Sequence, residues 1–264
     1  MHPQYFDSSA KTYDGDFTNT AIGKLQRAQV WKYLLPLLTS PRNILEINCG
    51  TGEDAWALSS QGHRVLATDV SGEMIEVAKA KLNNNQLSLR IVQAGFSSVK
   101  QCVGEEKFDL LFSNFGGLNC IDQTDLKNLS NDFASILKPN GKMFMVIMGT
   151  NCRWEQGYFL MKRNREKAFR RKNKNGVITT IRESVFKTYY YSPEEITSMF
   201  ASHFDMERIH PVGLFTPPSY LEFFFKNKKW LLSILNQLDN WIGSLSVFPN
   251  QSDHFVIVLK KKIL

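Results

Sequence analysis

The sequence predicts an α/β protein with a doubly wound, mostly parallel sheet of seven strands, and three observations support this fold class. Short apolar segments typical of buried strands alternate with helix-like segments between residues 43 and 148. A glycine turn joins the first of these strands to the helix that follows it. The chain has 264 residues, which is enough to cover both faces of such a sheet with helices.

The first half of the chain supplies strands and helices in alternation. Before the first strand, apolar residues from Ile22 to Leu38 recur at nearly helical spacing, and Pro41 ends that helix. A turn over residues 138–141 precedes the fifth strand. The expected elements are helices over 21–38, 53–61, 72–83 and 122–137, and strands over 43–48, 64–68, 87–92, 108–113 and 142–148.

The second half departs from this alternation after Gly149. Residues 151–191 combine a basic stretch with a polar, alternating one, and we interpret them as an insertion over the sheet. A helix then begins after Ser192, which can cap it, with Pro193 in the first turn. A strand over 204–210, a long helix over 220–245 and a last strand over 253–260 complete the chain.

The composition is ordinary for a globular protein, with 43% hydrophobic and 22% charged residues. Cys49, Cys102, Cys120 and Cys152 are far apart and form no C-x-x-C pair, so we expect neither a metal site nor a disulfide framework. The N-terminus lacks the pattern of a secretory signal, and no apolar run reaches the roughly 18 residues that a membrane span needs. The expectation is a cytoplasmic protein without a membrane span.

The formal net charge of +7 is concentrated in one basic run. Residues 162–174 hold eight Lys and Arg residues and one Glu, which equals the whole excess. Charge runs usually form solvated faces, so Arg170, Arg171 and Lys172 are expected to contribute little to folding. Phe169 is the single aromatic residue in the run, which disfavours nucleic acid as a partner. An acidic carrier protein or a phosphate-bearing substrate fits the charge equally well.

The most informative motif is the glycine turn after the first predicted strand, which reads ILEINCGTG over residues 44–52. Its glycines would let a ligand approach the backbone closely. Glu46 stands in an otherwise apolar strand, where a carboxylate is costly unless it faces a cleft and a polar or cationic partner. Asp69 ends the next strand, at a spacing from which a carboxylate accepts hydrogen bonds from ribose hydroxyls. The motif predicts a nucleoside-ligand site.

From about Tyr13 to Met148 the chain resembles the class I S-adenosylmethionine-dependent methyltransferases. The resemblance rests on ILEINCGTG, on ATDVSGEMIEVAKAK from residue 67, on FDLLFSNFGGLN from residue 108 and on LKPNGKMFMVIM from residue 137. It implies the Rossmann-like fold of that family and S-adenosylmethionine as cofactor. The motifs are specific for the superfamily and leave the substrate open.

The resemblance also assigns roles to individual residues. Glu46 would bind the methionine end of the cofactor, Asp69 would hold the ribose, and the remaining expected cofactor-binding residues are Tyr13, Asn48, Gly50, Gly52, Val70, Met74, Ala94, Gly95, Phe96 and Asn114. Val70 and Met74 would border the adenine. The family often has an acid near residue 95 that reaches the adenine amino group, and its absence here leaves adenine to backbone and packing.

Two motifs bear on the acceptor. Methyltransferases that act on base amines often carry Asn-Pro-Pro-aromatic after the fourth strand, whereas residues 114–117 read Asn-Phe-Gly-Gly, so base-amine methylation is disfavoured. Near the N-terminus, FDSSAKTYD over residues 6–14, followed by Leu25-Gln26-Arg27, is similar to the small-molecule branch, which includes ubiquinone-type and malonyl-carrier-protein methyltransferases. In that branch a tyrosine corresponding to Tyr13 closes over the cofactor.

Two alternatives stay open at this point. The glycine turn and Asp69 also satisfy the dinucleotide fingerprint, and Tyr158 stands four residues before Lys162, as in short-chain dehydrogenases, so an NAD-dependent oxidoreductase is the first alternative. The short glycine pattern and the acid at Glu46 argue against it. A nucleic-acid methyltransferase or binding protein that uses the basic run is the second alternative.

The chemistry at the acceptor is less determined, and we assign no catalytic residue. His203, His210 and His254 are candidate bases without a diagnostic neighbour. Aromatic residues of the C-terminal half are expected to wall an apolar acceptor pocket, namely Tyr189, Tyr190, Tyr191, Phe215, Tyr220 and Phe223 to Phe225.

The sequence therefore predicts an S-adenosylmethionine-dependent methyltransferase acting on a small, apolar or carrier-linked acceptor. Its task would be to align the acceptor with the methyl group and to exclude water. We expect a single domain over 1–264, divided into a helical cap (1–42), a cofactor-binding core (43–150), the insertion (151–191) and a C-terminal part (192–264) that completes the sheet and covers the acceptor.

Overall fold

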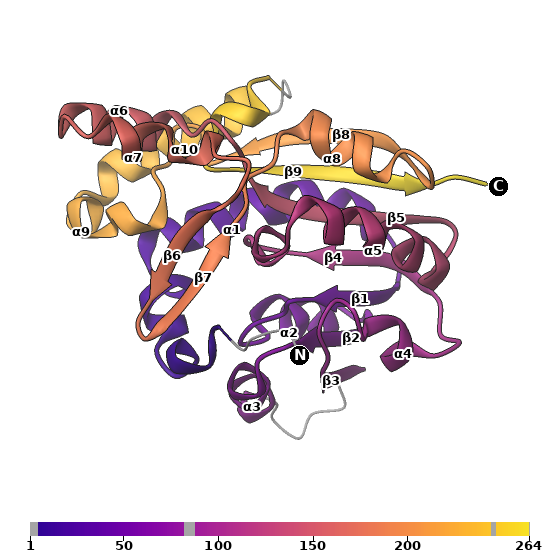
Figure 1. Ribbon diagram of the computed structural model, residues 1–264. Coiled ribbons are helices and arrows are strands. Elements are labelled where there is room, and N and C mark those ends of the chain that lie inside the picture. Colours follow the sequence, from indigo (N-terminus) through magenta and orange to yellow (C-terminus); the bar gives the residue numbers. More distant parts are fainter. Residues whose placement is uncertain (1–4, 82–87, 244–246, 264) are drawn as a thin grey trace.

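One central sheet organises the computed structural model, which describes residues 5–81, 88–243 and 247–263 (Figure 1). The strands lie in the order β3-β2-β1-β4-β5-β9-β8. The first five strands in this order are parallel to one another, whereas β9 is antiparallel to both β5 and β8. This confirms the doubly wound, mostly parallel sheet of seven strands. The strands are β1 (Asn43–Ile47), β2 (Arg64–Asp69), β3 (Leu89–Gln93), β4 (Phe108–Ser113), β5 (Leu137–Met148), β8 (Phe204–Val212) and β9 (His254–Lys261).

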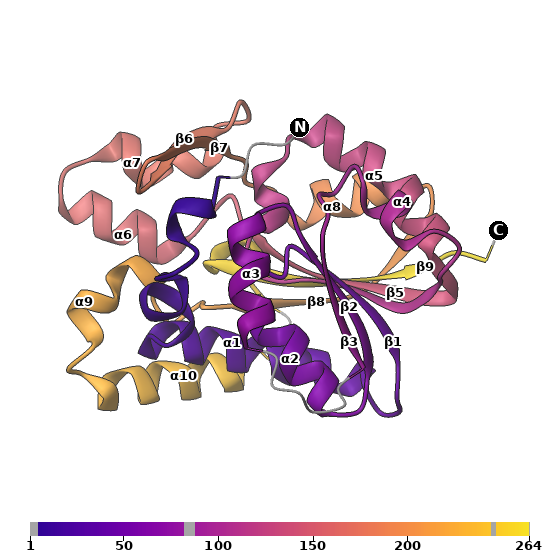
Figure 2. The same ribbon diagram turned by 90° about the horizontal axis from the view of Figure 1, so that it is seen from below.

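Helices cover both faces of this sheet (Figure 2). One face carries α1 (Ala21–Leu34), α2 (Glu53–Ser60), α3 (Gly72–Ala80) and α10 (Lys229–Gly243), and the other carries α4 (Val99–Val103), α5 (Gln123–Ile136) and α8 (Pro193–Phe200). Because both faces are covered, Phe112 of β4, Phe144 of β5 and Phe255 of β9 are completely buried, which explains the continuous apolar runs in these strands. No helix within the described ranges is long and apolar enough to cross a membrane.

The predicted long helix over 220–245 is instead broken. A short turn over Ser219–Leu221 leads into α9 (Glu222–Phe225), and α10 begins only at Lys229. Each helix is anchored separately. The carboxylate of Glu222 accepts the N–H groups of Ala21 and Ile22 at 3.0 and 2.9 Å and so caps the N-terminus of α1. Asp239 of α10 accepts the N–H groups of residues 214–216 at 2.7–3.0 Å. The break at 226–228 lets both carboxylates reach their partners.

Three predicted boundaries lie outside the described residues, namely Asn83, Leu87 and Leu245. The predicted start of the fifth strand differs for another reason. The turn over 138–141 stays within β5, which begins at Leu137, and the β4–β5 register shifts between Phe108 and Leu110. The β5 pairing from Lys142 onward follows the prediction.

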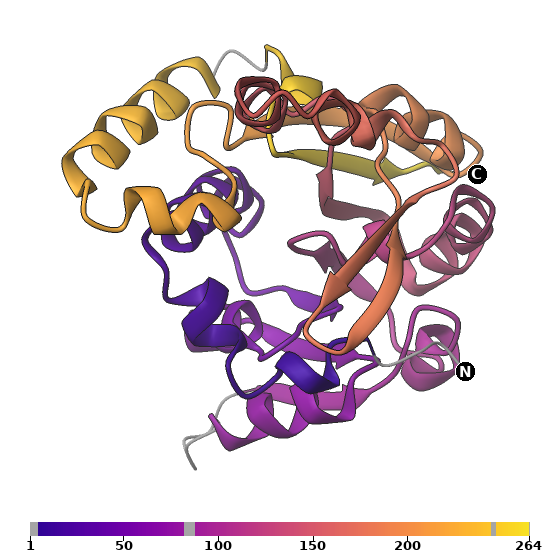
Figure 3. The same cartoon turned by 60° about the vertical axis from the view of Figure 1, so that its left-hand side comes forward.

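The segment expected to be an insertion forms two helices and a hairpin. They are α6 (Arg153–Met161), α7 (Arg165–Phe169), β6 (Val177–Ile181) and β7 (Ser184–Thr188). The segment returns to the sheet at Tyr191, which pairs with Gly149 in an isolated parallel bridge. Figure 3 shows the hairpin reaching to the N-terminal segment. There Tyr5 stacks on Phe186 with ring centroids 4.8 Å apart, and Arg182 donates to Asp16 at 2.9 Å.

The basic run is only partly solvated, which corrects the expectation for Arg170 and Arg171. Arg171 is 5% exposed, and its guanidinium donates to Glu155 at 3.1 Å and to Asp253 at 2.7 Å. Arg170 donates to the same Glu155 at 2.8 and 3.1 Å. Lys172 is exposed, as expected. Because Glu155 and Asp253 are themselves buried, Arg171 balances two carboxylates and joins the insertion to the start of β9.

Arg171→Met should therefore lower the free energy of unfolding by about 3–5 kcal/mol, the usual cost of leaving buried charges without their partner. Lys172→Ala is the matched control, and the loss of an exposed cation beside Phe169 should cost about 1 kcal/mol or less. Urea unfolding of both variants measures the difference. Equal stability of the two variants would show that Arg171 is not a structural element of the insertion.

Candidate active site

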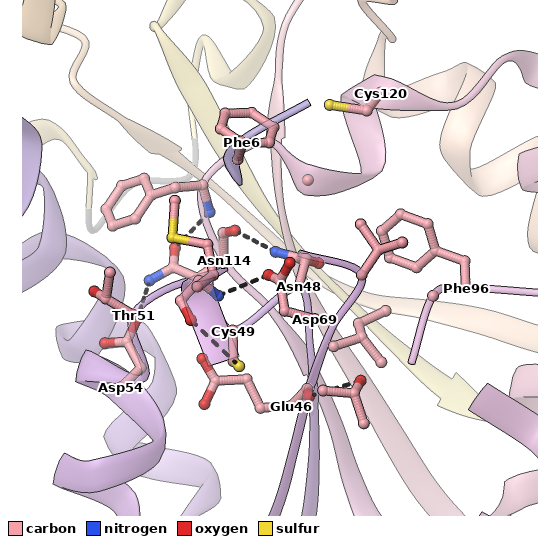
Figure 4. Close-up of a pocket in the computed structure, with 18 of the residues that line it drawn as sticks. Phe6, Glu46, Asn48, Cys49, Thr51, Asp54, Asp69, Phe96, Asn114 and Cys120 are labelled. Atoms are coloured by element: carbon pink, nitrogen blue, oxygen red, sulfur yellow. Dashed lines mark hydrogen bonds between the residues drawn. The ribbon is translucent and has the colours of Figure 1, made fainter. Parts of the chain in front are cut away.

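A pocket lies at the carboxyl ends of β1, β2 and β4 (Figure 4). The strands of a parallel sheet end at one edge, so residues distant in sequence meet there. Eleven of the twelve residues expected at a cofactor site line the pocket: Tyr13, Glu46, Asn48, Gly50, Asp69, Val70, Met74, Ala94, Gly95, Phe96 and Asn114. Gly52 does not.

The glycine turn explains this difference. Gly50 has φ +54°, and a Cβ at this position would meet nothing within 4 Å, so its backbone borders open space. Gly52 has φ +75° and stands before the first turn of α2. A Cβ there would come within 2.9 Å of the Cβ of Ala78. Gly52 thus allows α3 to pack against the turn. Its contact with the cofactor stays a prediction.

Asp69 holds the glycine turn in place. One carboxylate oxygen accepts the N–H of Gly50 at 2.8 Å, and the other accepts the N–H of Ser71 at 2.9 Å. Burial raises the pKa of Asp69, and the backbone hydrogen bonds oppose this rise. Each carboxylate oxygen can accept a second hydrogen bond, so the side chain that orders the turn can also receive hydroxyl groups from a ligand.

Two buried polar groups at the pocket have no partner. Glu46 is 2% exposed and its Oε2 accepts no hydrogen bond, while the Nε of Arg27 donates none. Both residues line the pocket. Burial, with a smaller contribution from Asp54, raises the pKa of Glu46 well above its usual range. A free acceptor and a free donor in one pocket suit a ligand that carries both a cationic and an anionic group.

Arg27 owes its position to Asp54, which the sequence analysis did not single out. Asp54 forms an ion pair with Arg27 and accepts the indole N–H of Trp31 at 2.7 Å and the amide of Asn114 at 2.8 Å. It is 4% exposed. In the sequence, Asp54 is only a carboxylate in the first turn of a helix after a glycine turn. Its three partners lie on other elements, so the local pattern does not reveal its role. Arg27 itself belongs to the Leu25-Gln26-Arg27 part of the N-terminal motif, to which the sequence assigned no role at the pocket.

Asn48 and Asn114 line the pocket but use their side chains within the protein. Asn48 donates to the carbonyl of Asn114 at 2.8 Å and accepts the hydroxyl of Ser113 at 2.6 Å. Its φ is +50°, and a Cβ on Gly117 would lie 2.4 Å from its Cγ. The Asn114 amide donates to Asp54, and its oxygen accepts the N–H of Phe115 at 2.9 Å. Neither side chain is left to grip an acceptor amine.

The N-terminal segment closes one side of the pocket. Asp7 accepts a hydrogen bond from Ser71, and Asp14 accepts the hydroxyl of Thr51 at 2.6 Å. Asp14 also pairs with Lys81 at 2.6 Å. Tyr13 lies between these two attachments and lines the pocket, and burial raises its pKa to about 12. The segment is therefore tied to the loops after both β1 and β2.

Part of the pocket lining is apolar. It includes Phe6, Phe115, Cys120 and Ile121, and Figure 4 shows Phe6 and Cys120 across the pocket from Glu46. None of the aromatic residues expected from the C-terminal half lines this pocket. Tyr191, for example, is buried and donates to the carbonyl of Ile121, whereas Phe223 is 75% exposed.

The three candidate histidines lie in different surroundings. His210 stacks on Tyr33 with ring centroids 4.1 Å apart. His203 lies at the turn before β8. His254 packs edge-on against Phe115 at 5.7 Å, and its Nδ1 lies 3.3 Å from Asp253. Of the three, it is the one whose ring contacts a residue of the pocket wall.

Residues 44–141 match the family described as methyltransferase domain. These residues form a class I S-adenosylmethionine-dependent methyltransferase domain. The chain is 30% identical over 152 residues to malonyl-[acyl-carrier protein] O-methyltransferase of Priestia megaterium, covering 54% of this chain and 50% of that protein. It is 26% identical over 148 residues to demethylmenaquinone methyltransferase of Clavibacter sepedonicus, covering 55% and 57%. The chain thus spans about half the length of these curated relatives.

The methyltransferase fold extends over the whole chain. The structure of phosphoethanolamine N-methyltransferase 2 from Haemonchus contortus, in complex with S-adenosyl-L-methionine, aligns with a TM-score of 0.58 at 19% identity. The alignment covers 100% of this chain and 59% of that one. The elements outside residues 44–141 therefore belong to the same architecture.

S-adenosylmethionine is the cofactor of this domain, and the pocket residues fit it. The free acceptor of Glu46 and the free donor of Arg27 complement the ammonium and carboxylate of its methionine part. Asp69 would receive the ribose hydroxyls beside the open backbone of Gly50. The half-buried residues 94–96 and the buried Met74 would supply an apolar border for the adenine.

The dehydrogenase alternative fails on geometry. Tyr158 and Lys162 lie at the end of α6, where the Lys162 ammonium sits 4.6 Å from the centre of the Tyr158 ring. Neither residue lines the pocket. Tyr158 packs against Tyr220 and Phe224 instead. Within the described part of the chain, no group of three or more His, Cys, Asp and Glu residues is arranged to hold a metal ion.

Glu46→Gln should weaken binding of S-adenosylhomocysteine by about 10- to 100-fold, because a hydrogen bond to a charged group is lost. The same change should stabilise the ligand-free protein at neutral pH. The pKa of Glu46 is higher in the folded than in the unfolded protein, so the free energy of unfolding falls as pH rises from the unfolded-state value through the folded-state value. Glutamine does not ionise, so the variant does not lose this stability. Calorimetry and thermal unfolding measure the two effects.

The exposed Glu73→Gln serves as the control, with no change expected in either measurement. Wild-type affinity should also decrease as pH is lowered, because a protonated Glu46 cannot accept the ligand ammonium. Unchanged affinity of Glu46→Gln at all pH values would remove Glu46 from the site.

Proposed function

We propose that the protein transfers a methyl group from S-adenosylmethionine to a small, largely apolar acceptor, free or linked to a carrier. The observation that carries this proposal is the division of the pocket. One end presents the free polar groups of Glu46 and Arg27, whereas Phe6 and Cys120 lie across the pocket from Glu46, and Phe115 and Ile121 add to the apolar lining. An apolar wall favours an acceptor with little charge, since burying an unpaired charge against it would be costly.

The bound cofactor supplies an electrophilic methyl group on a sulfonium leaving group. The chain's own residues have to orient the acceptor and keep water away. Tyr13 and the N-terminal segment cover one side of the pocket. Phe17 of that segment packs edge-on against Phe115 at 5.0 Å, and Phe115 in turn contacts His254 at 5.7 Å.

Base amines are a poor match for this pocket. The Asn114 side chain, which stands where base-amine enzymes present their gripping residue, donates to the buried Asp54 and accepts from Phe115. The names of the two relatives, which specify a malonyl-carrier protein and demethylmenaquinone, also support a small or carrier-linked acceptor.

His254 is the group best placed to accept a proton from a hydroxyl or amine acceptor. The Nδ1 of His254 lies 3.3 Å from the carboxylate of Asp253, so the two groups are close enough to interact electrostatically. Although burial opposes ionisation, His254 and Arg171 hold the pKa of Asp253 well below its usual range. An ionised Asp253 would stabilise the imidazolium that forms when the acceptor proton is taken up.

Incubation with methyl-labelled S-adenosylmethionine and fractionated cell extracts tests the acceptor class. The label should enter an organic-soluble small molecule or a carrier-linked acyl group. Asp69→Ala is the negative control, because the variant loses a ribose acceptor and the contact that holds Gly50. Efficient labelling of RNA or DNA without a labelled small molecule would overturn the proposal.

His254→Gln should lower kcat on the identified acceptor by about 100-fold or more, the usual contribution of a general base, with little change in cofactor affinity. The matched control is His203→Gln, which alters a histidine without contact to the pocket wall. A wild-type kcat in His254→Gln would mean that positioning alone suffices and that the acceptor needs no base.

A further inference from the structure

Large apolar side chains gather on the outer side of three neighbouring elements. Met161 at the end of α6 is 81% exposed, Phe223 and Phe224 of α9 are 75% and 48% exposed, and Trp230 and Ile234 of α10 are 67% and 47% exposed. We refer to these five residues as the aromatic surface. The elements are adjacent, because Tyr158 of α6 packs against Phe224 with ring centroids 6.2 Å apart. Figures 1 and 2 show the end of α6 and α9 along one edge of the molecule.

The orientation of α10 is unusual for a helix that packs on a sheet. Trp230 and Ile234 lie one turn apart on the same side of the helix, while Leu232 and Asp239 face the protein and are 2% and 5% exposed. The inward face of α10 is thus anchored by the buried carboxylate of Asp239, and its outward face exposes Trp230. Contiguous exposed apolar residues of this kind mark an interaction surface.

Positive charge surrounds the aromatic surface. Lys226, Lys228 and Lys229 lie at the break between α9 and α10, and all three are exposed. The two acids of residues 219–243, Glu222 and Asp239, are both engaged in capping backbone N–H groups. On the outer side of residues 219–243, no acidic side chain of this segment therefore balances the positive charge of the three lysines.

These lysines are unfavourable within the protein itself. Lys228 and Lys229 stand at the N-terminal end of α10, where the helix dipole is positive and cations are destabilising. An anionic surface outside the protein would relieve this cost. Lys162 and Arg163, exposed after Met161, extend the same charge to the end of α6.

We propose that the aromatic surface and its lysines dock the protein on an anionic lipid membrane. Tryptophan and phenylalanine partition into the interfacial layer of a bilayer, while lysines beside them contact anionic headgroups. The residues belong to separate elements along one edge of the molecule, and a fluid lipid surface can accommodate such an edge without a complementary shape. The surface is separate from the methyltransferase pocket, so this proposal does not depend on the acceptor.

Flotation with vesicles tests the docking. The full-length protein should bind vesicles of phosphatidylcholine with 30% phosphatidylglycerol, a composition chosen at roughly the charge of an anionic leaflet, and should bind pure phosphatidylcholine weakly. Phe223→Ser combined with Trp230→Ser should abolish binding. Trp56→Ser on α2, which removes a tryptophan that is 46% exposed elsewhere, is the matched control and should bind as the wild type does.

The lysines are tested separately. Changing Lys226, Lys228 and Lys229 to Gln should weaken binding to the anionic vesicles by about tenfold or more, since each lysine near a charged bilayer contributes roughly a fivefold factor. A triple variant of the exposed Lys11, Lys127 and Lys187 to Gln has the same net charge and should lose far less. S-adenosylhomocysteine affinity, measured by calorimetry, should be unchanged in every variant.

Three results would overturn the proposal. The first is no binding of the wild type to anionic vesicles, and the second is an equal loss of binding in the two lysine variants. The third is a wild-type dimer in sedimentation velocity without lipid that dissociates on Phe223→Ser and Trp230→Ser, which would make this surface an interface between copies of the chain. Loss of cofactor affinity alone would bear on the proposed function and not on the membrane.

Discussion

The arrangement of the pocket depends on one buried carboxylate, that of Asp54. It receives donors from two residues of α1 and from the end of β4, and so fixes the distance between the helical cap and the sheet. Arg27 and Asn114, which both line the pocket, are thus held by the same carboxylate. A buried acid is costly unless every oxygen is satisfied, and here three donors meet that condition. The polarity of the pocket is therefore a consequence of how α1 packs.

A second consequence concerns stability in the absence of ligand. Glu46 and Arg27 leave an acceptor and a donor unsatisfied in a buried place, which costs free energy that no contact inside the protein returns. Active sites commonly carry such a cost because the groups are directed to a ligand. The resting protein is less stable than its core would allow, and the cofactor supplies the missing partners.

The sequence predicted the parts of this structure that depend on local pattern. Apolar runs located the strands, and the strand ends located Glu46, Asp69 and Asn114, because parallel strands end at one edge. Pairings between distant residues were not predictable in this way. Nothing in the basic run distinguishes Arg171, which meets Asp253 across 82 residues, from the solvated Lys172 beside it. The long C-terminal helix was predicted as continuous because its break serves contacts with residues 21–22 and 214–216. The motif marked Gly52, but its close approach to Ala78 of α3 could not be read from the sequence.

The N-terminal segment over the pocket affects the speed of turnover. It is attached by the side chains of Asp7, Asp14 and Asp16, and by ring contacts such as that of Phe17 with Phe115. None of them belongs to the sheet, so the segment can open while the core stays folded. The contacts of Asp14 with Lys81 and of Asp16 with Arg182 are ion pairs, which weaken as ionic strength rises. Salt should thus speed the exchange of spent cofactor while leaving the folded core intact, and product release and chemical transfer are governed by separate parts of the chain.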